Sequence, residues 1–287
     1  MEPPGARNAW RHVVALSLSK LSDGLVDPKL VLSWLLGAMG VPAAFIGMLV
    51  PIREAGALLP QIVLGGWLSR LRQRRWVWVT GSAVQGVAAI GIALAALWTA
   101  GALAGVLVCA LLACLAVARA ACSVSYKDIL GKTVGQSRRG AVTGLAGSVS
   151  AAAVVIFAAL MLTGVLKSQT ALIAAIAVAG LVWLVAAMVL AGLHEEDSTP
   201  DGASPVDTYR EIIRRDANLR RFILVRGLLV STALAPPYMV LLTAKEGGAL
   251  GTLGAMLLAS SAAAFVSSYV WGRLADRNSA GVLVMAG

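Results

Sequence analysis

Charged residues are scarce in this sequence. Asp, Glu, Lys and Arg together make up 13% of the 287 residues, whereas an ordinary soluble domain has roughly 25%. Apolar residues make up 59%, and the mean hydropathy is +0.82. These values exclude a soluble globular domain and a disordered chain, because neither combines so much apolar surface with so little charge. They predict a polytopic membrane protein of the all-α class.

Cysteine and histidine are also rare, with three and two copies. Cys109, Cys114 and Cys122 lie in or at the end of one apolar run, and no neighbouring Cys or His completes a zinc-binding set. We expect three small buried side chains and no disulfide framework. Because the sequence also has no metal-ligand set and no nucleophile elbow, we predict neither an enzyme nor a bound metal or cofactor.

Uncharged runs of membrane-spanning length alternate with short basic loops. A helix needs about 20 apolar residues to cross the hydrocarbon core. We predict eight spans and the start of a ninth, the eight lying at residues 13–38, 42–68, 76–98, 101–122, 140–164, 169–193, 219–243 and 248–271. Three parts follow from this division: a six-helix bundle (1–193), a cytoplasmic linker with a short amphipathic helix (194–218), and a partial second bundle (219–287).

The basic residues fall almost entirely on one side of the predicted spans. The other side carries only Lys167 and Lys245. This bias predicts a multi-pass protein of the plasma (inner) membrane with a cytoplasmic N-terminus. We therefore interpret the net charge of +10 as an orientation signal and expect the lipid bilayer, not a nucleic acid, as the partner.

Six charges nevertheless lie inside the first two predicted spans: Lys20, Asp23, Asp27, Lys29, Arg53 and Glu54. A charge near the bilayer centre costs at least roughly 2.5–3.5 kcal/mol unless it is paired or wetted, and these six sum to zero. Pro28 should break the first helix, because proline cannot donate a backbone hydrogen bond. If the hairpin between the two spans turns near residue 40, Arg53 lies opposite Asp27.

We expect these charges to line a polar cavity between spans one, two and seven. Asp23, Asp27 or Glu54 would bind and release a proton. Lys20, Arg53 and Arg226 would hold the resting carboxylate or an anionic group of a substrate. The alternative is an ion-pair network that only fixes the packing of the helices.

Two loop segments share a sequence pattern. The first begins Gly66-x-Leu and continues through Arg70, Arg74 and Arg75. The second, 206 residues later, reads Gly272-Arg-Leu-Ala-Asp276-Arg277. At this offset Lys20 corresponds to Arg226, so the two side chains should face each other across a pseudo-twofold axis.

Both segments resemble the loop motif of the major facilitator superfamily of secondary transporters, Gly-x-Leu-Ala-Asp-Arg-x-Gly-Arg-Arg. Arg70 stands where that motif has Asp. The resemblance implies a conformational role for seven residues: Gly66, Arg70, Arg74, Arg75, Gly272, Asp276 and Arg277.

The resemblance also implies an activity. We expect a transporter that moves a small-molecule substrate by alternating access, coupled to H+, on a chain truncated after the eighth helix. Two alternatives stay open: a non-transporting assembly or scaffold protein on the same fold, and an inactive truncated transporter.

Overall fold

The computed structural model describes residues 4–163, 168–198, 211–245 and 252–263. Within these residues all regular secondary structure is helical, which confirms the all-α class. The elements are α1 (Pro4–Leu25), α2 (Val31–Ala38), α3 (Ala43–Leu58), α4 (Pro60–Leu68), α5 (Arg75–Trp98), α6 (Gly101–Thr133), α7 (Gln136–Leu162), α8 (Gln169–Ala191), α10 (Ala217–Val230), the 3-10 helix η1 (Ser231–Leu234), α11 (Ala235–Lys245) and the helix Thr252–Ala263.

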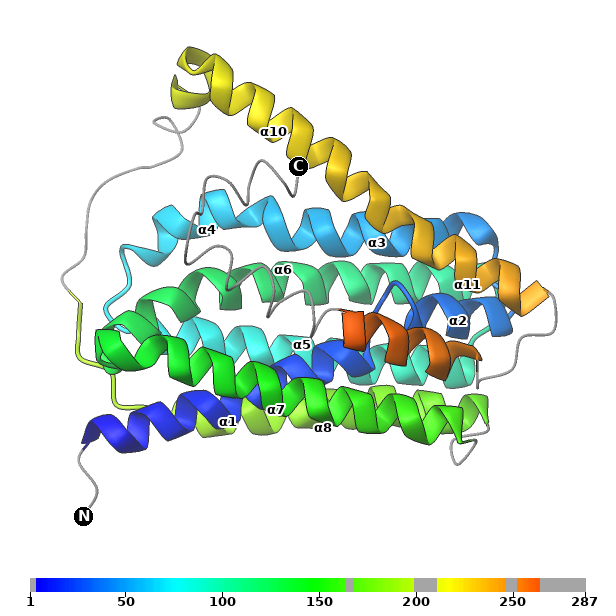
Figure 1. The fold of residues 1–287 in the computed structure, drawn as a ribbon, viewed down its shortest axis with the longest axis horizontal. Helices are drawn as coiled ribbons and strands as arrows, with labels where there is room; N and C mark the ends of the chain where they lie inside the picture. Colours follow the sequence, from blue (N-terminus) through cyan, green and yellow to red (C-terminus); the bar gives the residue numbers. More distant parts are fainter. Residues whose placement is uncertain (1–3, 164–167, 199–210, 246–251, 264–287) are drawn as a thin grey trace.

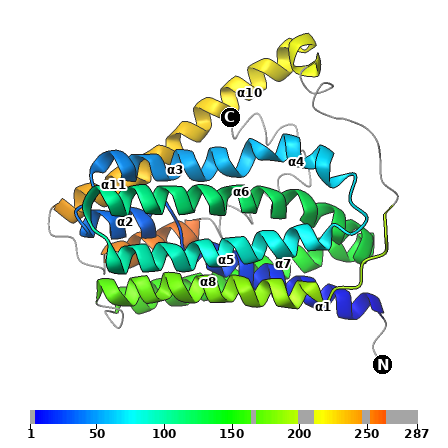
Figure 2. The same cartoon turned by 180° about the vertical axis from the view of Figure 1, so that it is seen from behind.

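The long helices lie side by side along the long axis of the molecule (Figures 1 and 2). Helix α5 packs between α6 and α8, and α1 packs against α7 and α8. Helix α3 covers α6 on its other side. The six predicted N-terminal spans thus form one bundle, in which α1 with α2 and α3 with α4 each make a single passage.

Within the described ranges, five helical segments are long and apolar enough to cross a membrane: Ala43–Leu68, Arg75–Trp98, Gly101–Thr133, Arg138–Leu162 and Gln169–Ala191. They correspond to predicted spans two to six. Predicted span four, which corresponds to Gly101–Thr133, is longer than predicted. Helix α6 continues to Thr133 through a polar stretch that the hydropathy pattern had assigned to a loop from residue 123. Polar residues continue a helix readily where neighbouring helices supply partners for their side chains.

The first predicted span is broken. Helix α1 ends at Leu25 and α2 begins at Val31, with Pro28 in the non-helical segment between them. The Ser33 hydroxyl donates to the Pro28 carbonyl at 2.8 Å and so satisfies one backbone group that the break leaves without a helical partner. The prediction of a break at Pro28 is confirmed.

Close contact between α5 and α8 fixes the core. A Cβ atom added to Gly86 would lie 2.7 Å from the carbonyl oxygen of Gly180, so only glycine fits there. The Ser82 hydroxyl donates to the Trp183 carbonyl, and Trp183 is fully buried. Small residues at such contacts let two helix backbones approach closely, as is common in membranes.

The three cysteines differ in exposure. Cys109 and Cys122 are buried, as predicted, whereas Cys114 is exposed. The prediction was wrong for Cys114, because position 114 lies on the side of α6 that no other described helix covers. An exposed cysteine within an apolar span is compatible with a lipid-facing surface, where a thiol acts as a small apolar group.

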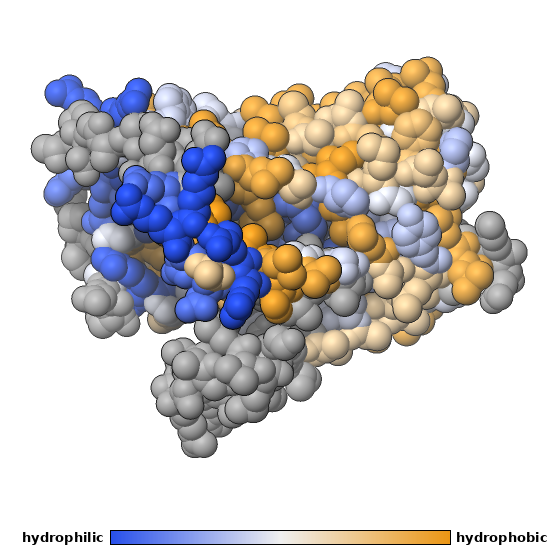
Figure 3. Space-filling view, turned by 90° about the horizontal axis from the view of Figure 1, so that it is seen from above, coloured by the Kyte–Doolittle hydropathy of each residue, from blue (hydrophilic) through white to orange (hydrophobic). Residues whose placement is uncertain are grey.

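Polar and apolar surfaces are separated along the length of the bundle. Hydrophilic residues gather at one end of the face in Figure 3, and apolar residues cover most of the remainder. We call the first the basic end; it contains the start of α1, the α4–α5 loop and residues 192–198. The loops at 39–42 and 99–100 define the opposite end.

The second part of the chain meets the bundle near the opposite end. Helix α11 packs against α2 and α3, where Gly47 leaves room for the Tyr238 hydroxyl. Gly254 packs against the last turn of α7. At the basic end, in contrast, α10 diverges from α4 (Figure 1). The predicted amphipathic helix falls mostly outside the described residues; its last part, 211–215, is helical, with Ile212 and Ile213 exposed.

Candidate functional site

The centre of the candidate site is Asp23 on α1, whose carboxylate binds two arginines. Arg53 Nη2 donates to Asp23 Oδ1 at 2.8 Å, and Arg119 Nη1 donates to Oδ2. The side chains of Asp23 and Arg53 are 17% and 14% exposed, so their ion pair is largely shielded from solvent. Charged hydrogen bonds of this kind are about twice as strong as neutral ones.

This cluster lies near mid-height of the bundle. Arg119 stands 18 residues after Gly101 and 14 before Thr133, at the two ends of α6. Asp23 lies two residues before the end of α1, next to the break in the first passage. Broken helices with charged groups near the bilayer midplane are typical of the binding sites of secondary transporters.

The predicted pairing of Arg53 with Asp27 is wrong. Arg53 binds Asp23 instead, and Asp27 Oδ1 accepts the backbone N–H groups of Lys29 and Leu30 at 2.9 and 2.8 Å. Asp27 therefore caps the backbone where the chain turns into α2, as short polar side chains do at helix starts. The antiparallel register is shifted by about one helical turn from that of a hairpin turning at residue 40.

The other predicted charges occupy different places. Lys29 Nζ lies 3.2 Å from Glu54 Oε1, and both side chains are about one-third exposed. Lys20 lies one turn before Asp23 and forms no ion pair within the part of the chain that the structure describes. Arg226 belongs to α10, but its side chain lies outside the described part, so its facing Lys20 stays a prediction.

Arg119 is the functional candidate that sequence reasoning missed. It lies near the end of the predicted fourth span (101–122) and was counted with the basic residues that follow that span, whereas α6 carries it at mid-height. The six predicted charges balance, but Arg119 adds a seventh that leaves the group with an excess positive charge. Its signal in the sequence was a single arginine at the end of an apolar run, which resembles an orientation signal.

A cavity of about 210 Å³ lies beside Asp23 between α1, α5 and α6. It extends toward the basic end, where Lys127 is exposed. Its lining residues are Leu16, Ser19, Lys20, Asp23, Trp78, Arg119, Cys122, Ser123, Tyr126 and Lys127. Three of them are cationic and only one is anionic, so the cavity favours a negatively charged occupant.

Two polar atoms near the cavity have no hydrogen-bond partner among the described residues. One is the buried hydroxyl of Tyr126, and the other is Gln85 Oε1. The Gln85 amide nitrogen lies 3.3 Å from Cys122 Sγ, which faces the cavity. Buried polar groups without partners are rare and often mark the place of a water molecule or a ligand.

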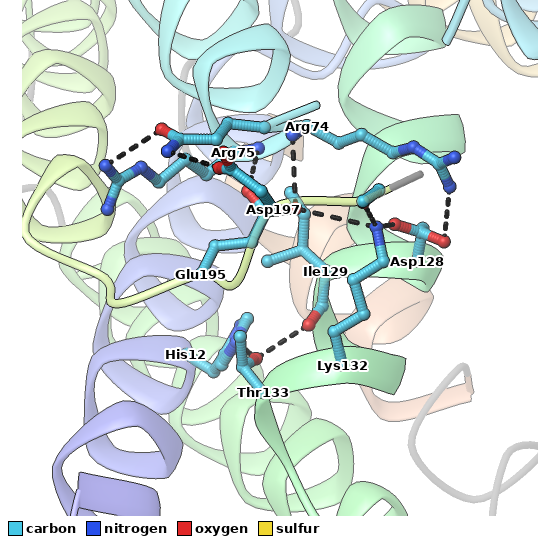
Figure 4. A network of polar contacts seen from close by, with 11 residues as sticks. His12, Arg74, Arg75, Asp128, Ile129, Lys132, Thr133, Glu195 and Asp197 are labelled. Carbon is cyan, nitrogen blue, oxygen red and sulfur yellow. Dashed lines mark hydrogen bonds and ion pairs between the residues drawn. The ribbon is translucent and has the colours of Figure 1, made fainter. Parts of the chain in front are cut away.

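A second charged network lies at the basic end (Figure 4). Glu195, whose side chain is fully buried, accepts the backbone N–H groups of Arg74 and Arg75 at 3.1 and 2.8 Å. Lys132 bridges Glu195 and Asp128, and Arg74 binds Asp128 at 2.5 Å. The acid caps the start of α5, where free N–H groups and the helix dipole favour a negative charge.

Residues 193–198 are therefore held in place by hydrogen bonds, although all but the first belong to the segment predicted as a linker (194–218). Arg75 donates to the Leu193 carbonyl, and Gln73 donates to Asp197 at 2.9 Å. The Ser198 N–H donates to the Arg72 carbonyl, also at 2.9 Å. These contacts hold the segment after α8 across the basic ends of α5 and α6, and we call residues 193–198 the strap.

His12 lies next to this network, one residue before the first predicted span. Its Nε2 atom is 2.7 Å from the Thr133 hydroxyl, which itself donates to the Ile129 carbonyl. His12 therefore carries its proton on Nε2 and donates to Thr133. The ring is fully buried and stands edge-on to Tyr126, and this burial lowers the pKa of His12 to about 4.

The predicted loop-motif residues are partly described. Gly66 is buried near the end of α4, and Arg70 is exposed. Arg74 and Arg75 belong to the network at the basic end. Gly272, Asp276 and Arg277 lie outside the described residues.

The membrane-length helices and the charged site at mid-height together define a multi-pass membrane protein with a polar centre inside its apolar region. Comparison with known families identifies it further: the model of the Major Facilitator Superfamily matches residues 13–287, so the chain belongs to this superfamily of membrane transporters. The resemblance inferred from the loop motifs is confirmed. Since members of the superfamily are transporters, the protein is not an enzyme. No curated protein matches the chain.

Proposed function

We propose that this protein moves a small solute across the membrane by alternating access, coupled to H+, through the cavity beside Asp23. The observation that carries the proposal is the double arginine pairing of Asp23 at mid-height of the bundle. Charged side chains inside the bilayer raise the free energy of the folded protein, so those that are present there usually serve a function. The Asp23 carboxylate then has two states: ionised and bound to the two arginines, or protonated and released from them.

Asp23 is the proton-binding group in this proposal, chosen from the three predicted acids. It faces the cavity, whereas Asp27 uses its carboxylate to cap the backbone. Glu54 forms a pair with Lys29 that lies farther toward the opposite end and is more exposed. Protonation of Asp23 would release Arg53 and Arg119 together, so one proton changes the state of two cations.

The arrangement of the two parts of the chain supports alternating access. Among the described residues, the contacts between the two parts lie near the opposite end, through α11 and Gly254, whereas α10 diverges from α4 at the basic end (Figure 1). The cavity also extends toward the basic end. We infer a state open toward that end, which the basic loops would place in the cytoplasm of a cell with an inner membrane.

The network of Arg74, Asp128, Lys132 and Glu195 supports a conformational role for the loop after α4. Arg74 and Arg75 would hold the strap in place while the two parts of the chain rock about the site. Because Arg70 is exposed, it is free to meet the second part of the chain when the basic end closes.

Proton release or uptake driven by solutes tests this function without knowing the substrate. The purified protein is reconstituted in vesicles that contain a pH-sensitive dye, and a panel of small acids, amines, sugars and amino acids is added outside. We expect one chemical class to change the internal pH in the wild type. In Asp23→Asn this response should be lost, because asparagine cannot bind and release the proton.

Arg138→Gln is the matched control, since Arg138 is an exposed cation at the start of α7 and lines no part of the cavity. It should behave as the wild type does. A response of Asp23→Asn equal to that of the wild type would overturn the role of Asp23. Wild-type vesicles that respond to no class of solute would instead support a scaffold on the same fold.

A further inference from the structure

The charges around the cavity are unequal. Lys20, Arg119 and Lys127 line it together with a single acid, Asp23, and Arg53 approaches the same acid from α3. Among the described residues, no other carboxylate lines this cavity. Even while Asp23 is ionised, the cationic side chains outnumber the anionic one. The cavity therefore keeps a net positive charge that a negatively charged ligand would neutralise.

Asp23 itself shows what kind of group fits between the arginines. Its two carboxylate oxygens each accept from a different guanidinium, one from α3 and one from α6. Guanidinium groups bind carboxylates through such paired, directional hydrogen bonds. When Asp23 is neutral, the two arginines present the same donors to any other carboxylate that reaches them.

We propose that the substrate is a small organic carboxylate, which takes the place of the Asp23 carboxylate at Arg119 and Arg53 when Asp23 is protonated. This inference rests on the proposed function and names its substrate class. The proton and the carboxylate then bind together. Protonation of Asp23 frees the two arginines for the ligand, and the ligand carboxylate supplies the negative charge that the arginines lose when Asp23 becomes neutral. A monocarboxylate that crosses with one proton adds no net charge to the passage.

The walls of the cavity limit the size and shape of the ligand. Its volume of about 210 Å³ corresponds to roughly seven water molecules at about 30 Å³ each. Leu16 and Trp78 supply apolar surface, while Ser123 and the unpaired Tyr126 hydroxyl supply polar groups. A carboxylate with a short body, either apolar or carrying one hydroxyl or keto group, matches these walls.

Equilibrium binding to the purified full chain in lipid nanodiscs tests this assignment. The probes are acetate, lactate and pyruvate, compared with inorganic phosphate, uncharged glycerol and cationic ethanolamine. We expect at least one of the three carboxylates to bind the wild-type protein more tightly than phosphate, glycerol and ethanolamine do, because a carboxylate matches the paired donors of the two arginines.

Two single variants separate the roles of the acid and the arginine. Asp23→Asn should bind the carboxylate more tightly than the wild type does, since its two arginines have no carboxylate of the protein to pair with. Arg119→Gln should weaken binding by at least about tenfold, the effect of losing one charged hydrogen bond. Arg138→Gln should match the wild type.

Removal of Arg119 alone leaves Asp23 with one partner, so the protein could lose stability. The double variant Asp23→Asn/Arg119→Gln avoids this, because it removes both members of the pair. We expect it to fold as judged by a monodisperse elution profile, and to bind the carboxylate at least about tenfold more weakly than Asp23→Asn.

Binding of glycerol, ethanolamine or phosphate in preference to all three carboxylates would overturn the assignment, as would the absence of carboxylate binding to both the wild type and Asp23→Asn. These outcomes are distinct from failure of the proposed function. Carboxylate binding without solute-driven proton movement would overturn transport and leave the ligand class standing. Proton movement driven by an amine or a sugar would overturn the ligand class and leave transport standing.

Discussion

Asp23 and Asp27 are four residues apart, yet different groups bind their carboxylates. Asp23 lies in the last turn of α1, where its side chain reaches two arginines. Asp27 follows the end of α1 and bonds to backbone N–H groups of its own segment. The break at Pro28 causes this difference, because it leaves N–H groups that only a nearby acceptor can satisfy.

The cap provided by Asp27 predicts the effect of two substitutions. Asp27→Ala should lower the free energy of unfolding by about 1 kcal/mol, the usual value of such a cap. Asp27→Asn keeps a side-chain oxygen and should cost clearly less. Thermal unfolding in detergent measures both. Equal losses in the two variants would show that the negative charge, and not the cap, matters at this position.

His12 predicts a dependence of stability on pH. Its pKa is about 4 in the folded protein and 6.5 when freely exposed. Between these values the unfolded chain binds a proton that the folded chain excludes, so stability falls as the pH drops from 6.5 towards 4. His12→Gln, which can still donate to Thr133, should show a shallower fall.

The difference between wild type and His12→Gln across this pH range isolates His12 from the carboxylates that also titrate there. Chemical unfolding at a series of pH values gives the two curves. Parallel curves would contradict the assignment of a buried neutral His12.

Among the elements, the α5–α8 pair depends most clearly on small residues. A Cβ atom on Gly86 would meet both the Gly180 carbonyl and the Leu184 side chain within 3 Å. Gly144 in α7 has no neighbouring atom within 4 Å of the same position among the described residues. The two glycines therefore provide a matched pair of helix positions with opposite surroundings.

Gly86→Ala should lower the free energy of unfolding by about 1–3 kcal/mol, because the extra methyl group forces the helices apart. Gly144→Ala should leave it unchanged or raise it, since alanine is the better helix former. Unfolding midpoints of the two variants in the same detergent check this. A loss of similar size in both would show that packing between α5 and α8 is looser than described.

The strap is the second element whose stability can be tested. Glu195 caps α5 and contacts Lys132, so Glu195→Ala leaves two backbone N–H groups and a lysine without this acceptor. We expect a loss of about 1–3 kcal/mol and faster proteolysis after α8. Glu196→Ala is the control, because Glu196 is exposed. Equal proteolysis of the two variants would contradict a fixed strap.

Sequence patterns predicted most helices because apolar runs and basic loops report directly on the membrane. They failed where polar residues continue a helix, as in α6, since hydropathy alone ended that span near residue 122. Arg119 was missed for another reason: it lies inside that predicted span but was counted with the basic residues that follow it. The partner of Arg53 was also predicted wrongly. A shift of one helical turn in the hairpin brings Asp23 in place of Asp27 opposite Arg53, and hydropathy does not fix the register of two helices to within one turn.

For the whole molecule, alternating access requires that the cavity beside Asp23 is reached from both sides of the membrane in turn. Contacts near the opposite end and the divergence of α10 at the basic end describe one of the two states. A scaffold protein would need no second state. Access to the cavity from each side therefore separates a transporter from a scaffold on the same fold.

The most direct measurement labels a single cysteine in the cavity. Ser123→Cys is made in a chain whose Cys109, Cys114 and Cys122 are replaced by alanine, and oriented vesicles are treated with a membrane-impermeant maleimide from either side. Arg72→Cys in the exposed α4–α5 loop is the control, which should react from one side only. If access to the cavity alternates, Ser123→Cys reacts from both sides. Reaction from the basic side alone, at every pH and with every solute of the panel, would contradict it.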